Sequence, residues 1–139
     1  MPSQLVRAQD RPVFVLCGAR SGSTLLRFLL DTHHLLACPA ETNIPALSEQ
    51  LAKAWSTIDG QPAAQSGKAL SPGAVSGEVL ARVRSVTDEL MAGYLARQDK
   101  QRFCDKSLGA AQHAGLLQRL YPQRSSSAWC GIRWTSSPR

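Results

Sequence analysis

The fold is decided by one stretch near the N-terminus, Pro12-Val-Phe-Val-Leu-Cys-Gly-Ala-Arg-Ser-Gly-Ser-Thr-Leu-Leu-Arg-Phe-Leu-Leu30. An apolar run over residues 13–17 leads into a polar turn, and an apolar segment with helical spacing follows it. This order predicts a buried strand, a tight turn and a helix. The backbone N–H groups of the turn and the positive N-terminus of the helix would then point at one place, which suits a phosphate group.

The turn differs from a Walker A loop, which requires G-x-x-x-x-G-K-[ST]. If Gly22 is taken as the second glycine, the first falls on Cys17 and the lysine falls on Ser23. The cation is instead Arg20, whose guanidinium can hold a phosphate oxygen with two hydrogen bonds. The alternative is a strand-to-helix turn that binds nothing, with Ser21 or Ser23 capping the helix.

Two later segments carry further polar patterns. The first contains Asp31-Thr-His-His34 and then Cys38-Pro-Ala-Glu-Thr-Asn-Ile-Pro45, and the second is Phe103-Cys-Asp-Lys-Ser107. Together with the turn they resemble the sulfotransferases that use 3′-phosphoadenosine 5′-phosphosulfate (PAPS). The bacterial and tyrosylprotein-sulfotransferase-like members are the most similar subtype. The resemblance extends over residues 12–123.

The resemblance implies that the polar turn is the donor-binding loop. Backbone N–H groups from Ser21 through Gly22 to Thr24, with the hydroxyls of Ser23 and Thr24, would hold the 5′-phosphate. Arg20 would neutralise charge on the bridging and leaving oxygens. PAPS is therefore the expected donor.

The resemblance also implies roles for two residues beyond the loop. Glu41 would accept the proton of the acceptor hydroxyl as general base, and Lys106 would place a second cation near the leaving group. No metal is expected, because arginine and lysine supply the positive field. The acceptor would be a hydroxyl on a small molecule or a peptide. Without the resemblance, Glu41 is an exposed loop carboxylate and Lys106 an ordinary surface lysine.

Length and composition limit the other possibilities. The 139 residues allow one domain, whereas sulfotransferase domains of this kind need about 200 residues, within the usual range for single domains. The net charge of +6 is scattered, with no basic block interleaved with aromatic residues, so no nucleic-acid partner is expected. No apolar run is long enough for a membrane span, and the widely spaced cysteines indicate reduced thiols, so a cytoplasmic location is expected.

The expected elements alternate between strands and helices. Strands are expected at residues 13–17, 35–38 and 102–105, and helices at 24–32, 44–58, 78–97 and 108–121. The expected apolar face of the 78–97 helix consists of Val79, Val83, Val86, Leu90 and Tyr94. The predicted fold class is α/β, with a P-loop-like parallel sheet flanked by helices in an incomplete domain. Residues 1–11 are a loose N-terminus, and 12–123 are the N-terminal part of a sulfotransferase domain.

Residues 124–139 do not fit this pattern, because they have no apolar periodicity yet contain Trp129 and Trp134. Reverse translation with each codon starting one base earlier forces a valine at Trp129-Cys130 and an aspartate at Trp134-Thr135. It also allows Val-Arg-His-Pro-Met-Asp-Val, a strand end followed by the Arg-x-Pro pattern that the family uses for the 3′-phosphate. Loss of one base near Gln123 would produce this tail. The alternative is a natural disordered tail rich in serine and arginine.

Three hypotheses about function follow. In the first, the chain is part of a PAPS-dependent sulfotransferase and is inactive in this form. In the second, it is a P-loop kinase-like nucleotide enzyme, against which the missing Walker lysine counts. In the third, it is a non-catalytic remnant.

Overall fold

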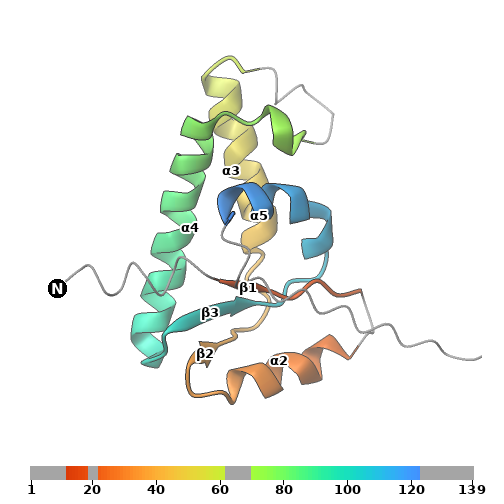
Figure 1. The fold of residues 1–139 in the computed structure, drawn as a ribbon, viewed down its shortest axis with the longest axis vertical. Helices are drawn as coiled ribbons and strands as arrows, with labels where there is room; N and C mark the ends of the chain where they lie inside the picture. Colours follow the sequence, from red (N-terminus) through yellow and green to blue (C-terminus); the bar gives the residue numbers. More distant parts are fainter. Residues whose placement is uncertain (1–11, 19–21, 62–69, 123–139) are drawn as a thin grey trace, which may run out of the picture.

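A computed structural model describes residues 12–18, 22–61 and 70–122. The strands are β1 (Val13–Phe14), β2 (Leu36–Ala37) and β3 (Arg102–Asp105), and the α-helices are α2 (Ser23–Asp31), α3 (Ile44–Ile58), α4 (Gly77–Gln98) and α5 (Ala114–Leu120). Short 3₁₀ turns η2 (Pro72–Ala74) and η3 (Ala110–His113) complete the described elements. Figure 1 shows α2 on one side of the strands and α3, α4 and α5 on the other.

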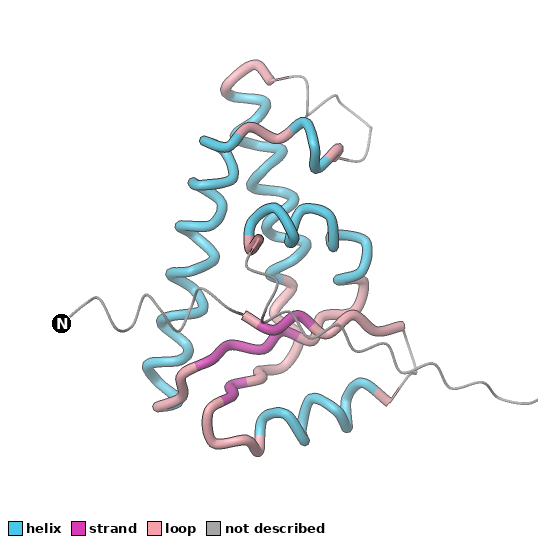
Figure 2. The backbone as a smooth tube through the Cα atoms, viewed as in Figure 1, coloured by secondary structure: helices cyan, strands magenta, loops and turns pink. Residues whose placement is uncertain are grey.

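The three strands form a parallel sheet in the order β1-β3-β2, which confirms the predicted α/β class. Val13 and Phe14 lie opposite Cys104 and Asp105, while Leu36 lies opposite Arg102. β3 is the central strand, and its carboxyl end lies beside that of β1 (Figure 2). The chain after β1 and the chain after β3 therefore leave the sheet at the same edge.

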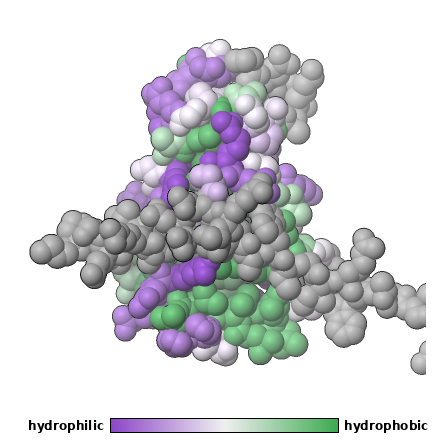
Figure 3. Space-filling model, in the orientation of Figure 1, coloured by the Kyte–Doolittle hydropathy of each residue, from purple (hydrophilic) through white to green (hydrophobic). Residues whose placement is uncertain are grey.

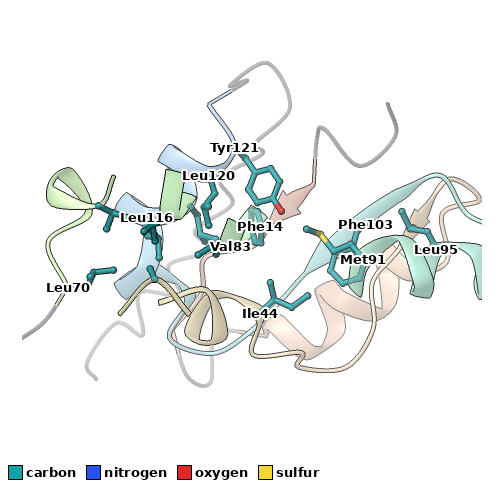
Figure 4. Close-up of a cluster of buried hydrophobic side chains, with 14 of the residues drawn as sticks. Phe14, Ile44, Leu70, Val83, Met91, Leu95, Phe103, Leu116, Leu120 and Tyr121 are labelled. Atoms are coloured by element: carbon teal, nitrogen blue, oxygen red, sulfur yellow. The ribbon is translucent and has the colours of Figure 1, made fainter. Parts of the chain in front are cut away.

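The main apolar core lies between the sheet and helices α3, α4 and α5 (Figure 4). Phe103 of β3 and Met91 of α4 are almost fully buried in it, and the Phe14 ring of β1 lies 5.7 Å from the ring of Tyr121. The Tyr121 hydroxyl is 2.8 Å from the Thr87 hydroxyl and donates to Asp88. The residue that follows α5 is thus packed against β1 on one side and α4 on the other.

The buried face of α4 differs from the predicted one. Its fully buried side chains recur at every fourth position: Val79, Val83, Thr87, Met91 and Leu95. Leu90, predicted to be in the core, is 48% exposed. Thr87 replaces an apolar side chain in this row because its hydroxyl contacts Tyr121 and the carbonyl oxygen of Arg84.

Met91 and Leu90 are neighbours on α4 that differ in burial, so their replacement by alanine gives a matched pair of substitutions. We expect Met91→Ala to lower the free energy of unfolding by about 2 kcal/mol or more, because it leaves a cavity in the core. We expect Leu90→Ala to change it by less than about 1 kcal/mol, as at most surface positions. Urea unfolding followed by circular dichroism measures both changes. Equal losses in the two variants would contradict the packing described above.

Candidate active site

The candidate site lies where the three strands end. The carboxyl ends of parallel strands share one edge of the sheet, which is where ligands bind in open α/β folds. β1 leads into the polar turn and α2, β2 leads into the loop that contains Glu41, and β3 leads into Lys106. The ends of β1 and β3 are joined directly, because the backbone N–H of Val15 donates to the carbonyl oxygen of Asp105 at 2.8 Å.

The first part of the site is the N-terminus of α2. Arg20 and Ser21 lie outside the described residues. Gly22 is the N-cap, with φ 79° and ψ 13°, a left-handed conformation that glycine adopts without strain. Ser23 is buried and Thr24 is exposed, and the first turn of α2 contains no acidic side chain. The first N–H groups of a helix have no intrahelical acceptor, so this terminus can receive an anion.

The second part is an ion pair between residues far apart in the sequence. The Nζ of Lys106 lies 3.1 Å from the Oε1 of Glu41. The Lys106 side chain is only 5% exposed, whereas that of Glu41 is 38% exposed. The structure therefore brings together two of the predicted site residues. The Glu41 carboxylate is accessible from solvent, and the Lys106 side chain is buried.

Asp105 is a site residue to which the sequence reasoning assigned no chemistry. It is fully buried, and its Oδ1 accepts hydrogen bonds from the hydroxyls of Thr42 at 2.5 Å and Ser107 at 2.9 Å. The Ser107 hydroxyl in turn accepts the backbone N–H of Asn43 at 3.1 Å. An acidic residue directly after the apolar Phe103-Cys104 pair of a strand was the available signal in the sequence.

Burial raises the pKa of the Asp105 carboxyl, although the hydrogen bonds from Thr42 and Ser107 lower it and the negative charge of Glu41 raises it further. An acid whose pKa is raised on folding binds protons more tightly in the folded state, so its contribution to stability is present at low pH. That contribution is lost as the pH rises from the ordinary aspartate value, about 3.9, to the higher folded value.

We therefore expect the stability of Asp105→Asn, relative to the unsubstituted chain, to increase as the pH rises through this window. Above the folded pKa the difference should become constant. Chemical unfolding at a series of pH values from acid to neutral measures it. A relative stability of Asp105→Asn that falls as the pH rises would mean that the folded state favours the carboxylate form.

The loop that carries Glu41 is held at its start by α2. The Asp31 carboxylate accepts the backbone N–H of Cys38 at 2.8 Å, and Arg27 donates to the Cys38 carbonyl oxygen at 3.0 Å. Hydrogen bonding from the Cys38 N–H lowers the pKa of Asp31, with a smaller effect from Lys100. The aspartate of the Asp31-Thr-His-His34 segment thus joins α2 to the chain that follows β2 and leads to Glu41.

The histidines of the same segment are exposed. The rings of His33 and His34 stack with centroids 4.7 Å apart, and His33 Nδ1 accepts the N–H of Leu35. Among the described residues, Cys17, Cys38 and Cys104 are free thiols, and no group of three or more His, Cys, Asp or Glu side chains is arranged to hold a metal ion. Within the same part of the chain, no helix is both long and apolar enough to cross a membrane.

Comparison with known proteins identifies the family. A model of the sulfotransferase family matches residues 12–124, which include the polar turn, the Glu41 loop and the Asp105-Lys106 segment. Comparisons with curated proteins and with solved structures gave no match. The matched region covers all of the described elements, and its three polar segments are those that follow β1, β2 and β3 in the chain. The chain belongs to the sulfotransferase family.

Proposed function

We propose that this site performs sulfuryl transfer from PAPS to an acceptor hydroxyl, in the form of the protein that contains the complete domain. The observation that carries the proposal is the pair of Glu41 and Lys106, 3.1 Å apart at the edge of the sheet where β1, the strand before the polar turn, also ends. An accessible carboxylate beside a buried ammonium group provides a base next to a cation. In-line transfer of a charged group needs both, and little covalent chemistry from the protein.

Each residue then has a defined part in the reaction. The acceptor oxygen attacks the sulfur atom as the bond from sulfur to the 5′-phosphate oxygen breaks, and 3′-phosphoadenosine 5′-phosphate leaves. Glu41 takes the proton from the acceptor hydroxyl. Arg20 and Lys106 stabilise the charge that develops on the leaving oxygen, while the turn from Ser21 to Thr24 holds the 5′-phosphate.

The exposure of Glu41 supports an acceptor that arrives from solvent. Its carboxylate is the more open partner of the ion pair, so a hydroxyl can reach it without displacing the buried Lys106 stem. The class of acceptor we propose is a small molecule or a peptide with a free hydroxyl. The cytoplasmic location remains a prediction from the sequence.

We also propose that residues 124–139 are an out-of-frame reading and that the chain in this form is catalytically inactive. The support is the codon analysis, in which Trp129-Cys130 and Trp134-Thr135 force residues that match the family's strand and 3′-phosphate segment. The coding DNA tests this proposal. The alternative frame after Gln123 should continue as a long open frame, and an early stop codon there would favour the natural-tail alternative.

The nucleotide prediction is tested by calorimetry on the protein with the restored frame. We expect it to bind PAPS and 3′-phosphoadenosine 5′-phosphate in the presence of a metal chelator, because cationic side chains and backbone N–H groups supply the positive field. Added Mg²⁺ should leave the affinity unchanged. Binding of ATP with Mg²⁺ but of neither PAPS-type nucleotide would favour the kinase-like alternative instead.

A further inference from the structure

One buried acidic group has no part in the proposed chemistry. Asp105 is fully buried and is linked to both residues of the ion pair. It precedes Lys106 in the chain, and it contacts Thr42, which follows Glu41. We propose that Asp105 is a positioning residue that holds Glu41 and Lys106 in register with each other. This inference rests on the proposed function of that pair.

Hydrogen bonds to one oxygen of Asp105 connect the loop that carries Glu41 with the segment that carries Lys106. A single oxygen, Asp105 Oδ1, accepts from Thr42 of the loop after β2 and from Ser107 of the segment after β3. Ser107 then accepts the N–H of Asn43, so the loop is held at two consecutive residues. Consecutive Cα atoms are about 3.8 Å apart, so fixing Thr42 and Asn43 restricts the Cα position of Glu41.

Asp105 is held in place by the backbone pairing of β3 with β1. Its residue pairs with Phe14 in the β1–β3 ladder, and its carbonyl oxygen accepts the N–H of Val15. Lys106 follows directly, with its side chain almost entirely buried. The carboxyl group therefore connects the loop after β2 to β3, the central strand of the sheet.

The stability of the fold does not by itself account for a carboxyl group at position 105. Burying a carboxyl group opposes folding unless its oxygens are well paired. Asp105 Oδ2 is buried and has no hydrogen-bond partner among the described residues. The direction of the pKa change, upward with burial as its main cause, agrees with a group that opposes folding. A carboxyl retained at such a position is consistent with a requirement of the site.

The test uses the full 139-residue chain and does not depend on any nucleotide. The rate of Lys106 acetylation is measured by mass spectrometry over a range of pH, with Lys53 as an accessible internal reference, since its side chain is 41% exposed although it pairs with Glu49 at 2.8 Å. Hydrogen exchange at the Asn43 amide is measured on the same samples. The variants are Asp105→Ala, Asp105→Asn and Thr42→Val, with Ser48→Ala as the matched control.

Asp105→Ala and Thr42→Val should accelerate Lys106 acetylation and Asn43 exchange by about tenfold or more. Loss of hydrogen bonds to the carboxyl group makes local opening of this segment more favourable, and both reactions proceed from the open state. Asp105→Asn keeps an acceptor oxygen and should restore rates near those of the unsubstituted chain. Ser48→Ala removes a buried hydroxyl that bonds within α3, so it should leave Lys106 unaffected. Lys53 should react at the same rate in every variant.

Unchanged Lys106 and Asn43 rates in Thr42→Val would overturn the proposal, and so would failure of Asp105→Asn to restore them. If Asp105→Ala unfolds the chain, its circular dichroism shows the loss of helix, and the Thr42→Val result decides. A positive result here together with no binding of PAPS-type nucleotides would leave the positioning network standing and refute the proposed function. The two can therefore fail separately.

Discussion

If residues 124–139 are the out-of-frame segment that we propose, restoring the frame after Gln123 is expected to give sulfuryl-transfer activity, whereas the 139-residue chain is expected to show none. α5 ends at Leu120, and Tyr121 packs on Phe14 of β1. The chain therefore leaves the helix beside β1, which is an outer strand of the described sheet. A further apolar strand at this point would pair with β1 and bring its carboxyl end to the same edge as Lys106.

The apolar surface of α2 agrees with this expectation. Its outward side chains Leu25, Phe28 and Leu29 are 66%, 54% and 59% exposed. Figure 3 shows an apolar area in the lower part of the molecule, where Figure 1 places α2. A complete domain would supply elements to cover this face. It would also supply the 3′-phosphate arginine, and loss of such a charge-assisted contact typically reduces affinity by more than about tenfold.

The measurement compares the 139-residue chain with the frame-restored protein, using PAPS as donor and a panel of hydroxyl acceptors. Production of 3′-phosphoadenosine 5′-phosphate should be detectable only for the restored protein. The restored protein carrying Arg20→Ala is the control for background, because that change should reduce both nucleotide affinity and turnover. Sulfuryl transfer by the 139-residue chain itself would refute the out-of-frame interpretation.

Glu41→Gln is expected to lower kcat of the frame-restored protein by about 10²-fold or more, the usual contribution of a general base. Glutamine has nearly the same shape and can still accept a hydrogen bond from Lys106 at the position of Oε1. It cannot take the acceptor proton, so the affinity for 3′-phosphoadenosine 5′-phosphate should stay nearly the same. Steady-state kinetics and calorimetry measure the two quantities.

Glu49→Gln is the matched control for this prediction. Glu49 also pairs with a lysine and contacts His113, but it lies within α3, away from the residues assigned to the reaction. Its replacement should leave kcat within about threefold of the original value, a change of about 0.7 kcal/mol or less in activation free energy, because neither Lys53 nor His113 is assigned a part in the reaction. Near-normal turnover in Glu41→Gln would show that another group is the base.

Much of the secondary structure could be predicted because local signals agreed with each other. α3 has the predicted bounds, since Pro45 favours the first turn of a helix, and β3 has the predicted bounds because its apolar residues follow a polar turn. The final predicted helix is shorter: η3 occupies its first part after Gly109, whose φ of 80° interrupts the helical backbone, and α5 begins at Ala114.

The candidate site was likewise predictable in part from the sequence. Local order in the sequence was enough to indicate a strand, a polar turn and a helix, and the motifs around Glu41 and Lys106 were enough for the resemblance to assign these two residues. Their pairing joins residues 65 positions apart, and the contact of Asp105 with Thr42 joins residues 63 positions apart. Such contacts depend on the β1-β3-β2 order of the sheet, which no local pattern encodes. The elements and the chemical types at the site could therefore be predicted from the chain. That a buried carboxyl group connects them could not, because burial and long-range hydrogen bonding arise from packing.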